Sequence, residues 1–225
     1  MSDKNDRIYI IYFAEVKAMN RHEAKKQIVE YGKMMAASGM VTLYEGNLSI
    51  RCDEGFVITP STTNKLTLTE DQVIELDNDG NFLNPECGKK VSSEYRLHLE
   101  AYRVRPDVGA CIHFHSTFAT AYAVAGKPIE PKGDATAIIL YGEIPLCRYG
   151  RPRTDAIAAD IKKYLPDHDA VLLENHGALV VAGDLEAAFA SAQIVEKTAQ
   201  IEWIAHTLGG ESILPDGEIE VLRNL

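Results

Sequence analysis

The sequence has no apolar run long enough for a membrane-spanning helix. The longest apolar stretch near the N-terminus, residues 8–14, is far shorter than the ~20 residues such a helix needs. Charged residues precede it and no small-residue cleavage site follows, which is not typical of a secretory signal peptide. We therefore predict a cytoplasmic protein with no membrane partner.

Closely spaced cysteines are also missing. The chain has four cysteines, which are widely scattered: Cys52, Cys87, Cys111 and Cys147. Without a C-x-x-C pair, a thiolate zinc site and a thioredoxin-like redox motif are both disfavoured. We expect four free thiols in a reducing compartment.

Positive charge is in deficit. Lysine and arginine number 23 against 33 aspartates and glutamates, so the formal net charge is −10. A protein that binds nucleic acid through phosphate contacts needs a basic surface, so the balance argues against a nucleic-acid partner. The 225 residues are 46% hydrophobic and 25% charged, as in an ordinary globular protein, and we expect one domain over residues 1–225.

Hydrophobic periodicity and capping residues alternate between helical and extended patterns along the chain. Together they predict an α/β fold with a mixed sheet and helices packed on its faces. The predicted helices cover residues 22–35, 93–103, 117–124, 155–164 and 184–206, the second with Ser92 or Ser93 as its N-cap. The main predicted strands include residues 48–52, 56–58, 72–76, 108–114, 170–173 and 178–181.

Three histidines stand at the ends of apolar strands. His113 and His115 are two residues apart, so both imidazoles should project from the same face of their strand. His176 lies between two further apolar strands, followed by Gly177, which lets the backbone pass close to a ligand. Three histidine ligands would leave a coordination position open, which is typical of catalytic metal sites. Each histidine alone is also compatible with a hydrogen-bonded structural role.

Glu94, at the start of a predicted helix, is the candidate carboxylate for this site. At that position it could simply interact favourably with the helix dipole, worth ~0.3–1 kcal/mol. Alternatively, it could act as a general base or as a fourth metal ligand. Periodicity alone does not distinguish these roles.

Five motifs in this order resemble those of the class II aldolase/adducin family, over about residues 22–208. The matching segments are Gly-Asn-Leu-Ser-Ile-Arg at 46–51, Ile-Thr-Pro-Ser at 58–61, Ser-Ser-Glu-Tyr-Arg-Leu-His at 92–98, His-Phe-His at 113–115 and Asn-His-Gly at 175–177. The resemblance implies a three-layer α/β/α domain with a mixed, largely antiparallel central sheet. It also implies a homotetramer with active sites at subunit interfaces.

The resemblance assigns roles to individual residues. His113, His115 and His176 match three ligands of Zn²⁺, or of another divalent cation such as Mn²⁺ or Co²⁺. Glu94 matches a fourth ligand that is also the catalytic acid/base. Tyr149 resembles a tyrosine that a neighbouring subunit lends for proton transfer. The positions that match phosphate-binding residues are Gly46, Asn47, Ser61, Thr62, Ser92 and Ser93. Thr62 stands where the family usually has glycine.

The activity that the resemblance implies is zinc-dependent aldol cleavage of a ketose 1-phosphate to dihydroxyacetone phosphate and an aldehyde. L-Fuculose 1-phosphate and a 5-deoxypentulose 1-phosphate are the candidate substrates. An epimerase of the L-ribulose-5-phosphate 4-epimerase type shares the metal site and is the main alternative, followed by a sugar-acid phosphate dehydratase or decarboxylase. A non-catalytic, adducin-like scaffold is disfavoured because all three histidines and Glu94 are present.

Overall fold

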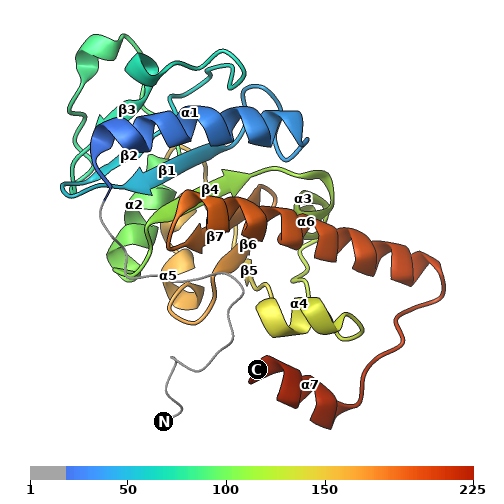
Figure 1. Ribbon diagram of the computed structural model, residues 1–225. Coiled ribbons are helices and arrows are strands. Elements are labelled where there is room, and N and C mark those ends of the chain that lie inside the picture. The colour runs from blue at the N-terminus through green and yellow to red at the C-terminus, as the bar shows by residue number, and fades with distance from the viewer. Residues whose placement is uncertain (1–18) are drawn as a thin grey trace.

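A seven-stranded sheet lies between two layers of helices in the computed structural model, which describes residues 19–225 (Figure 1). The apolar stretch 8–14 lies outside the described residues. Within them, no helix is both long and apolar enough to cross a bilayer.

The sheet is mixed and largely antiparallel. Its strands, in the spatial order β3-β2-β1-β4-β7-β6-β5, pair antiparallel at every junction except the parallel pair β5–β6. Their bounds are β1 Asn47–Arg51, β2 Phe56–Ile58, β3 Ile74–Leu76, β4 Ala110–Phe114, β5 Leu146–Cys147, β6 Ala170–Leu173 and β7 Gly177–Ala182. The predicted fold class is confirmed.

Helices cover both faces of this sheet (Figure 1). One face packs against α1 (Arg21–Ala37), α3 (Thr117–Val124) and α6 (Leu185–Thr207). The other packs against α2 (Tyr95–Val104), α5 (Ile161–Tyr164) and a 3₁₀ turn at Asp155–Ala158. Two further 3₁₀ turns cover Glu70–Gln72 and Pro85–Cys87.

Three parts of the chain differ from the sequence prediction. The helix expected over 155–164 is broken into a 3₁₀ turn and α5; at the junction the Asp160 carboxylate accepts a hydrogen bond from the Arg148 N–H at 2.9 Å. The strand expected over 72–76 is shorter: Gln72 ends the 3₁₀ turn Glu70–Gln72, and β3 begins at Ile74. Two short helices, α4 (Ala135–Leu140) and α7 (Asp216–Arg223), were not anticipated and form a small apolar cluster of their own.

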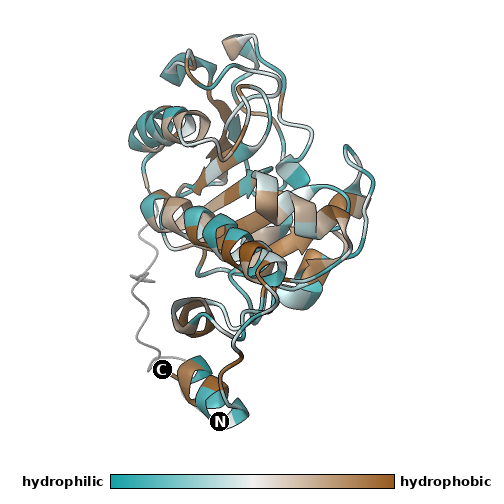
Figure 2. Cartoon of the chain, turned by 90° about the vertical axis from the view of Figure 1, so that its right-hand side faces the viewer, coloured by the Kyte–Doolittle hydropathy of each residue, from teal (hydrophilic) through white to brown (hydrophobic). Residues whose placement is uncertain are grey.

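Strand β4 in the middle of the sheet places polar and apolar side chains on opposite faces. Ala110, Ile112 and Phe114 belong to the core beneath α1, α3 and α6, as the apolar colouring of the strands in Figure 2 reflects. Successive side chains of a strand alternate, so Cys111 and His113 face the α2 side. The fold therefore directs His113 toward the layer that contains α2.

Candidate metal centre

His113 is the central residue of a cluster of polar side chains at one end of the sheet. It is fully buried and pairs with Asn47 on β1 and Leu179 on β7. Its Nδ1 lies 2.8 Å from the carbonyl oxygen of Ala178, which can only accept, so Nδ1 carries the proton. The lone pair of a neutral ring is then on Nε2, as a metal ligand requires.

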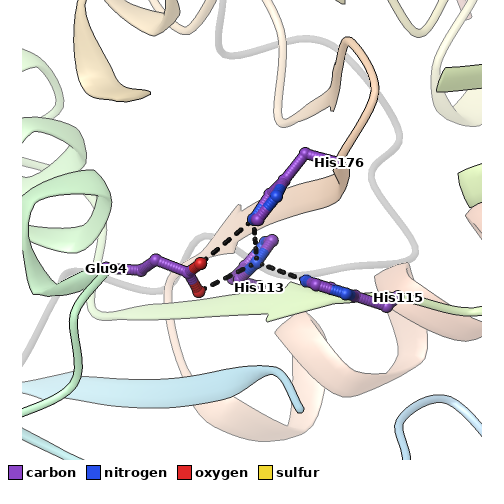
Figure 3. Close-up of side chains that lie close together, drawn as sticks. All are labelled: Glu94, His113, His115 and His176. Atoms are coloured by element: carbon purple, nitrogen blue, oxygen red, sulfur yellow. Dashed lines mark hydrogen bonds and ion pairs between the residues drawn. The ribbon is translucent and has the colours of Figure 1, made fainter. Parts of the chain in front are cut away.

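The other two histidines converge on this nitrogen. Nε2 of His115, just beyond β4, lies 2.8 Å from Nε2 of His113. Nε2 of His176, in the turn between β6 and β7, lies 3.1 Å from the same atom (Figure 3). Burial, reinforced by the two neighbouring imidazoles, lowers the pKa of His115 to about 3. The ring is therefore neutral at physiological pH, in the form that binds metals.

The turn that carries His176 depends on its two neighbours. Asn175 has a φ of 56°, in the left-handed region that asparagine tolerates better than most residues. A Cβ on Gly177 would lie 2.6 Å from the carbonyl oxygen of Phe114 and 2.9 Å from Cδ2 of His115. Glycine is therefore required for the turn to approach β4 closely enough to bring His176 into the cluster.

Glu94 completes the cluster from the N-terminal end of α2 (Figure 3). Its Oε2 lies 3.2 Å from Nε2 of His113 and its Oε1 lies 3.1 Å from Nε2 of His176. Burial alone would raise the pKa of Glu94, but the two imidazoles outweigh burial and hold that pKa well below its ordinary range. Glu94 is thus an ionised carboxylate, and its proximity to the histidines supports a role beyond that of a helix-dipole partner.

The four residues fit a divalent metal ion. One ligand atom from each of Glu94, His113, His115 and His176 can be chosen so that all lie within 4.8 Å of one another. The nitrogen separations of 2.8 and 3.1 Å are close to the ~3.3 Å expected between ligands with bonds of about 2.0–2.1 Å around a tetrahedral ion. The lone pairs on these nitrogen atoms face one another and repel. A cation placed between them would be coordinated by these lone pairs, and the repulsion would be removed.

A carboxylate from another layer holds the segment after His115. Glu196 on α6 accepts hydrogen bonds from the hydroxyl of Ser116 at 2.6 Å and from the N–H groups of Phe118 and Ala119 at 3.0 and 2.9 Å. These bonds satisfy donors at the N-terminus of α3 that have no partner within the helix. Glu196 therefore fixes the point at which the chain leaves His115, a function that no local sequence signal indicated.

The start of α2 differs from the prediction. The helix begins at Tyr95, and Glu94 occupies the N-cap position. Neither Ser92 nor Ser93 is therefore the N-cap residue. The Glu94 side chain does not bond back to the helix, because it is turned toward the histidines. The hydroxyl of Ser92 instead accepts a long hydrogen bond, 3.4 Å, from the Glu94 N–H.

The three predicted phosphate-binding segments adjoin near Glu94. The Asn47 amide donates to Glu94 Oε2 at 2.9 Å, and the Ser61 N–H donates to the carbonyl of Lys90, shortly before Ser92 and Ser93. Gly46 has a φ of 66°, and a Cβ there would lie 2.8 Å from the carbonyl oxygen of His113. These contacts place the segments together, and the phosphate-binding roles stay predictions.

Thr62 has a strained backbone beside these segments. Its φ is 49°, a region in which β-branched residues are rarely found and which costs of order 1–3 kcal/mol. A glycine would adopt this conformation without strain. Thr62 keeps the same backbone conformation at some cost in stability and adds a hydroxyl group. Strain of this kind is concentrated at functional sites.

Tyr149 follows β5 on the surface. Its side chain is 54% exposed, and its N–H donates to the carboxylate of Glu174 at 2.8 Å, two residues before His176. No hydrogen bond among the described residues ties its hydroxyl to the cluster of its own chain. Its proposed role at a neighbouring subunit's site stays a prediction.

Lys65 is a buried cation near the site that the sequence analysis did not identify. Only 3% of its surface is exposed, and its ammonium group donates to the carbonyl of Glu45, next to Gly46. Burial lowers the pKa of Lys65 to about 8, while the charges of Glu45 and Glu94 act in the opposite direction. The amine therefore remains mostly protonated at neutral pH and brings positive charge to the otherwise neutral phosphate-binding segments.

Comparison with known proteins identifies the same family as the motifs. Residues 26–203 match the family described as "Class II Aldolase and Adducin N-terminal domain". An L-fuculose phosphate aldolase of Escherichia coli O6:H1 is 32% identical over 183 residues, 81% of this chain and 84% of that protein. A 5-deoxy-D-ribulose 1-phosphate aldolase of Bacillus thuringiensis is 34% identical, over 88% of this chain and 92% of that one.

Other relatives extend the range of reactions. A 3-oxo-tetronate 4-phosphate decarboxylase of Haemophilus influenzae is 31% identical, over 89% of this chain and 96% of that protein. Among solved structures, an L-fuculose 1-phosphate aldolase superimposes with a TM-score of 0.83 at 30% identity, covering 93% of this chain and 98% of the other. The fold agrees with that of these enzymes.

We expect His113→Ala to abolish stoichiometric metal binding. The variant removes the ligand on which the other two imidazoles converge. The fall in metal affinity should therefore exceed the ~10–100-fold fall that follows when a group that only orients a ligand is removed. Metal content after dialysis, measured by mass spectrometry, tests this, with His168→Ala as a control in a histidine outside the cluster. Retention of one metal per chain by His113→Ala would refute the ligand assignment.

Proposed function

The chain belongs to the class II aldolase and adducin family, and we propose that it is a zinc-dependent aldolase that cleaves a ketose 1-phosphate to dihydroxyacetone phosphate and an aldehyde. Membership of this family, together with aldolase relatives that match most of the chain, makes it an enzyme of the lyase class. The observation that carries the proposal is the convergence of three histidine side chains and one carboxylate at a single point.

Zinc is the proposed ion because three histidine nitrogens and one carboxylate oxygen are ligands that Zn²⁺ favours, and Mn²⁺ or Co²⁺ could take its place. His113, His115 and His176 would hold the ion, with Glu94 as the fourth ligand. When bound, the ion supplies Lewis-acid stabilisation of the negative charge that develops on substrate oxygen. Imidazole ligands carry no charge when they bind a metal ion, so the ion would keep most of its positive charge for this task.

Glu94 is the proposed acid/base. Its carboxylate lies beside the ligand nitrogens and is held by the Asn47 amide, so it is positioned to accept a proton from a substrate carbon or hydroxyl beside the histidines. Proton transfer by a positioned group typically contributes 10²–10⁴-fold to rate. Tyr149, exposed on the surface, is the proposed partner in proton transfer at a neighbouring subunit's site.

The proposed phosphate site lies where the three predicted segments adjoin. The hydroxyls of Ser61, Thr62, Ser92 and Ser93 and the backbone at Gly46 would donate to the phosphate oxygens, near the N-terminus of α2, whose dipole favours anions. The buried ammonium of Lys65 adds a full positive charge to this region. Binding of the phosphate here would set the distance of the reacting carbons from Glu94.

Two other reactions of the family are the alternatives. The similarity to a decarboxylase of a phosphorylated sugar acid favours a sugar-acid phosphate as the second candidate substrate, and an epimerase acting on a pentulose 5-phosphate is the third. A non-catalytic scaffold is disfavoured because it would not need four converging ligand groups.

The substrate is tested by a panel assay on metal-analysed protein. The panel holds L-fuculose 1-phosphate, L-ribulose 1-phosphate, 5-deoxyribulose 1-phosphate, L-ribulose 5-phosphate and a 3-oxo-tetronate 4-phosphate. We expect release of dihydroxyacetone phosphate from one of the 1-phosphates, loss of that activity on chelation, and its return when Zn²⁺ is added.

Each other outcome contradicts the aldolase in a distinct way. Conversion of only the 5-phosphate would identify an epimerase, and release of CO₂ from only the sugar-acid phosphate would identify a decarboxylase. Protein that binds no metal and turns over nothing would support the scaffold.

We expect Glu94→Gln to lower kcat by at least ~10²-fold, because the amide cannot accept the proton that the carboxylate accepts. The glutamine is nearly isosteric, so the fold and the phosphate site should persist. Steady-state kinetics on the best substrate of the panel, with metal content and thermal unfolding measured in parallel, test this. A kcat within about twofold of the unmodified enzyme would place the base elsewhere.

We also propose a homotetramer with active sites at subunit interfaces. Large apolar side chains are exposed around the C-terminal end of α6, including Trp203 at 52%, Leu208 at 82% and Ile213 at 61%. Large apolar side chains exposed in this region favour contact with another subunit. Light scattering on the purified protein should give four times the chain mass of 24.8 kDa, and the mass of a single chain would contradict the proposal.

A further inference from the structure

A line of polar side chains runs between β1 and α2 in the otherwise apolar interior. Asn47 and Ser49 on β1 face Glu94, His98 and Tyr102 of the α2 segment, and hydrogen bonds connect all five residues. We call these five residues the β1–α2 polar seam. Asn47, Ser49, His98 and Tyr102 are each at most 6% exposed, so the seam is built into the core.

The seam forms because two periodicities match. Every second residue of a strand faces the same side and advances ~6.7 Å, whereas every fourth residue of a helix advances ~6 Å. Two residues of β1 therefore span about the same distance as four residues of α2. Asn47 on β1 therefore lies opposite Glu94, and Ser49 lies opposite His98 and Tyr102. Each of these pairs is in hydrogen-bond contact, and we call the successive pairs rungs.

The first rung has a defined direction. A carboxylate only accepts, so the Asn47 group 2.9 Å from Glu94 Oε2 must be the NH₂ of its amide. The amide oxygen of Asn47 then points to Nε2 of His98. Since an amide oxygen also only accepts, Nε2 of His98 must carry a proton.

The second rung supports this proton position. With a proton on Nε2, Nδ1 of a neutral His98 is an acceptor, and the Ser49 hydroxyl lies 2.7 Å from it as the donor. The Tyr102 hydroxyl, 2.7 Å from the Ser49 oxygen, donates in turn to Ser49. Burial lowers the pKa of His98 to about 3, and the ring is neutral at physiological pH.

We infer that His98 is a positioning residue for Glu94. Ser49 and Tyr102 keep the proton of His98 on Nε2, and this proton holds the amide oxygen of Asn47. The NH₂ group of Asn47 then faces Glu94 and holds the carboxylate in place. The inference rests on the proposed role of Glu94. Without this relay the amide of Asn47 could rotate by half a turn and present its oxygen to the carboxylate. The two acceptors would repel, and Glu94 would lose its position beside the histidines.

His98→Leu and His98→Gln form the informative pair. Leucine removes the proton that holds the Asn47 oxygen, whereas glutamine retains an N–H donor. We expect His98→Leu to lower kcat by ~10–100-fold, the range typical of groups that orient a metal ligand, with a smaller change in KM. His98→Gln should recover at least part of that loss. Thermal unfolding identifies any variant that fails through misfolding.

Ser49→Ala tests the relay by a readout that does not depend on activity. ¹⁵N NMR of histidine-labelled protein reports which ring nitrogen carries the proton, and we expect Nε2 of His98 in the unmodified chain. Ser49→Ala removes the donor to Nδ1, so a second tautomer should appear, and kcat should fall by a factor of the same order as in His98→Leu. Ser191→Ala is the matched control, since this serine is also buried but lies on α6.

The outcomes separate this inference from the proposed function. A proton on Nδ1 of His98 in the unmodified chain, or an unchanged tautomer in Ser49→Ala, would overturn the relay whatever the substrate is. A folded His98→Leu with unchanged kcat would overturn it as well. If the unmodified chain turns over no substrate of the panel, the proposed function fails, and the NMR comparison still decides the relay.

Discussion

The hydrogen bond from Nδ1 of His113 to the carbonyl of Ala178 is the interaction on which the site depends. It joins the two central strands β4 and β7, so the ring is held by the most buried part of the sheet. It places the proton on the far side of the imidazole and leaves Nε2 free to face the cluster. His115, His176 and Glu94 are all arranged around that one nitrogen.

Burial of so many polar groups is costly unless each of them has a partner. In the part of the chain described, the cost is met by a connected network: Glu94 by Asn47, Asn47 by His98, and His98 by Ser49. The histidine nitrogens that face one another are the exception, and a divalent ion is the partner that we propose for them. The same network would then serve both stability and metal binding, while the backbone at Thr62 is strained.

Residues outside the cluster are the natural place to look for substrate choice. The ligands that we propose would suit any reaction that begins by stabilising negative charge on a sugar oxygen, and relatives of similar identity do include both aldolases and a decarboxylase. On that proposal, substrate choice would come from the groups around the ion. The candidates are the buried ammonium of Lys65, the hydroxyl of Thr62 and the surface on which Tyr149 lies.

The sequence by itself determined the helices α1, α2, α3 and α6, most of the strands and the pair His113 and His115, because these depend on short spacings along the chain. The order of the five motifs likewise indicated the family and the third histidine. Only the tertiary structure brings Glu94 beside His113 and His176, because these histidines are 19 and 82 residues away along the chain. For the same reason the predicted capping role of Ser92 or Ser93 is not observed, and the contacts of His98, Lys65 and Glu196 were not foreseen from the sequence. Each of these roles is a contact between elements distant in sequence, and such contacts exist only once the sheet has brought its strands together.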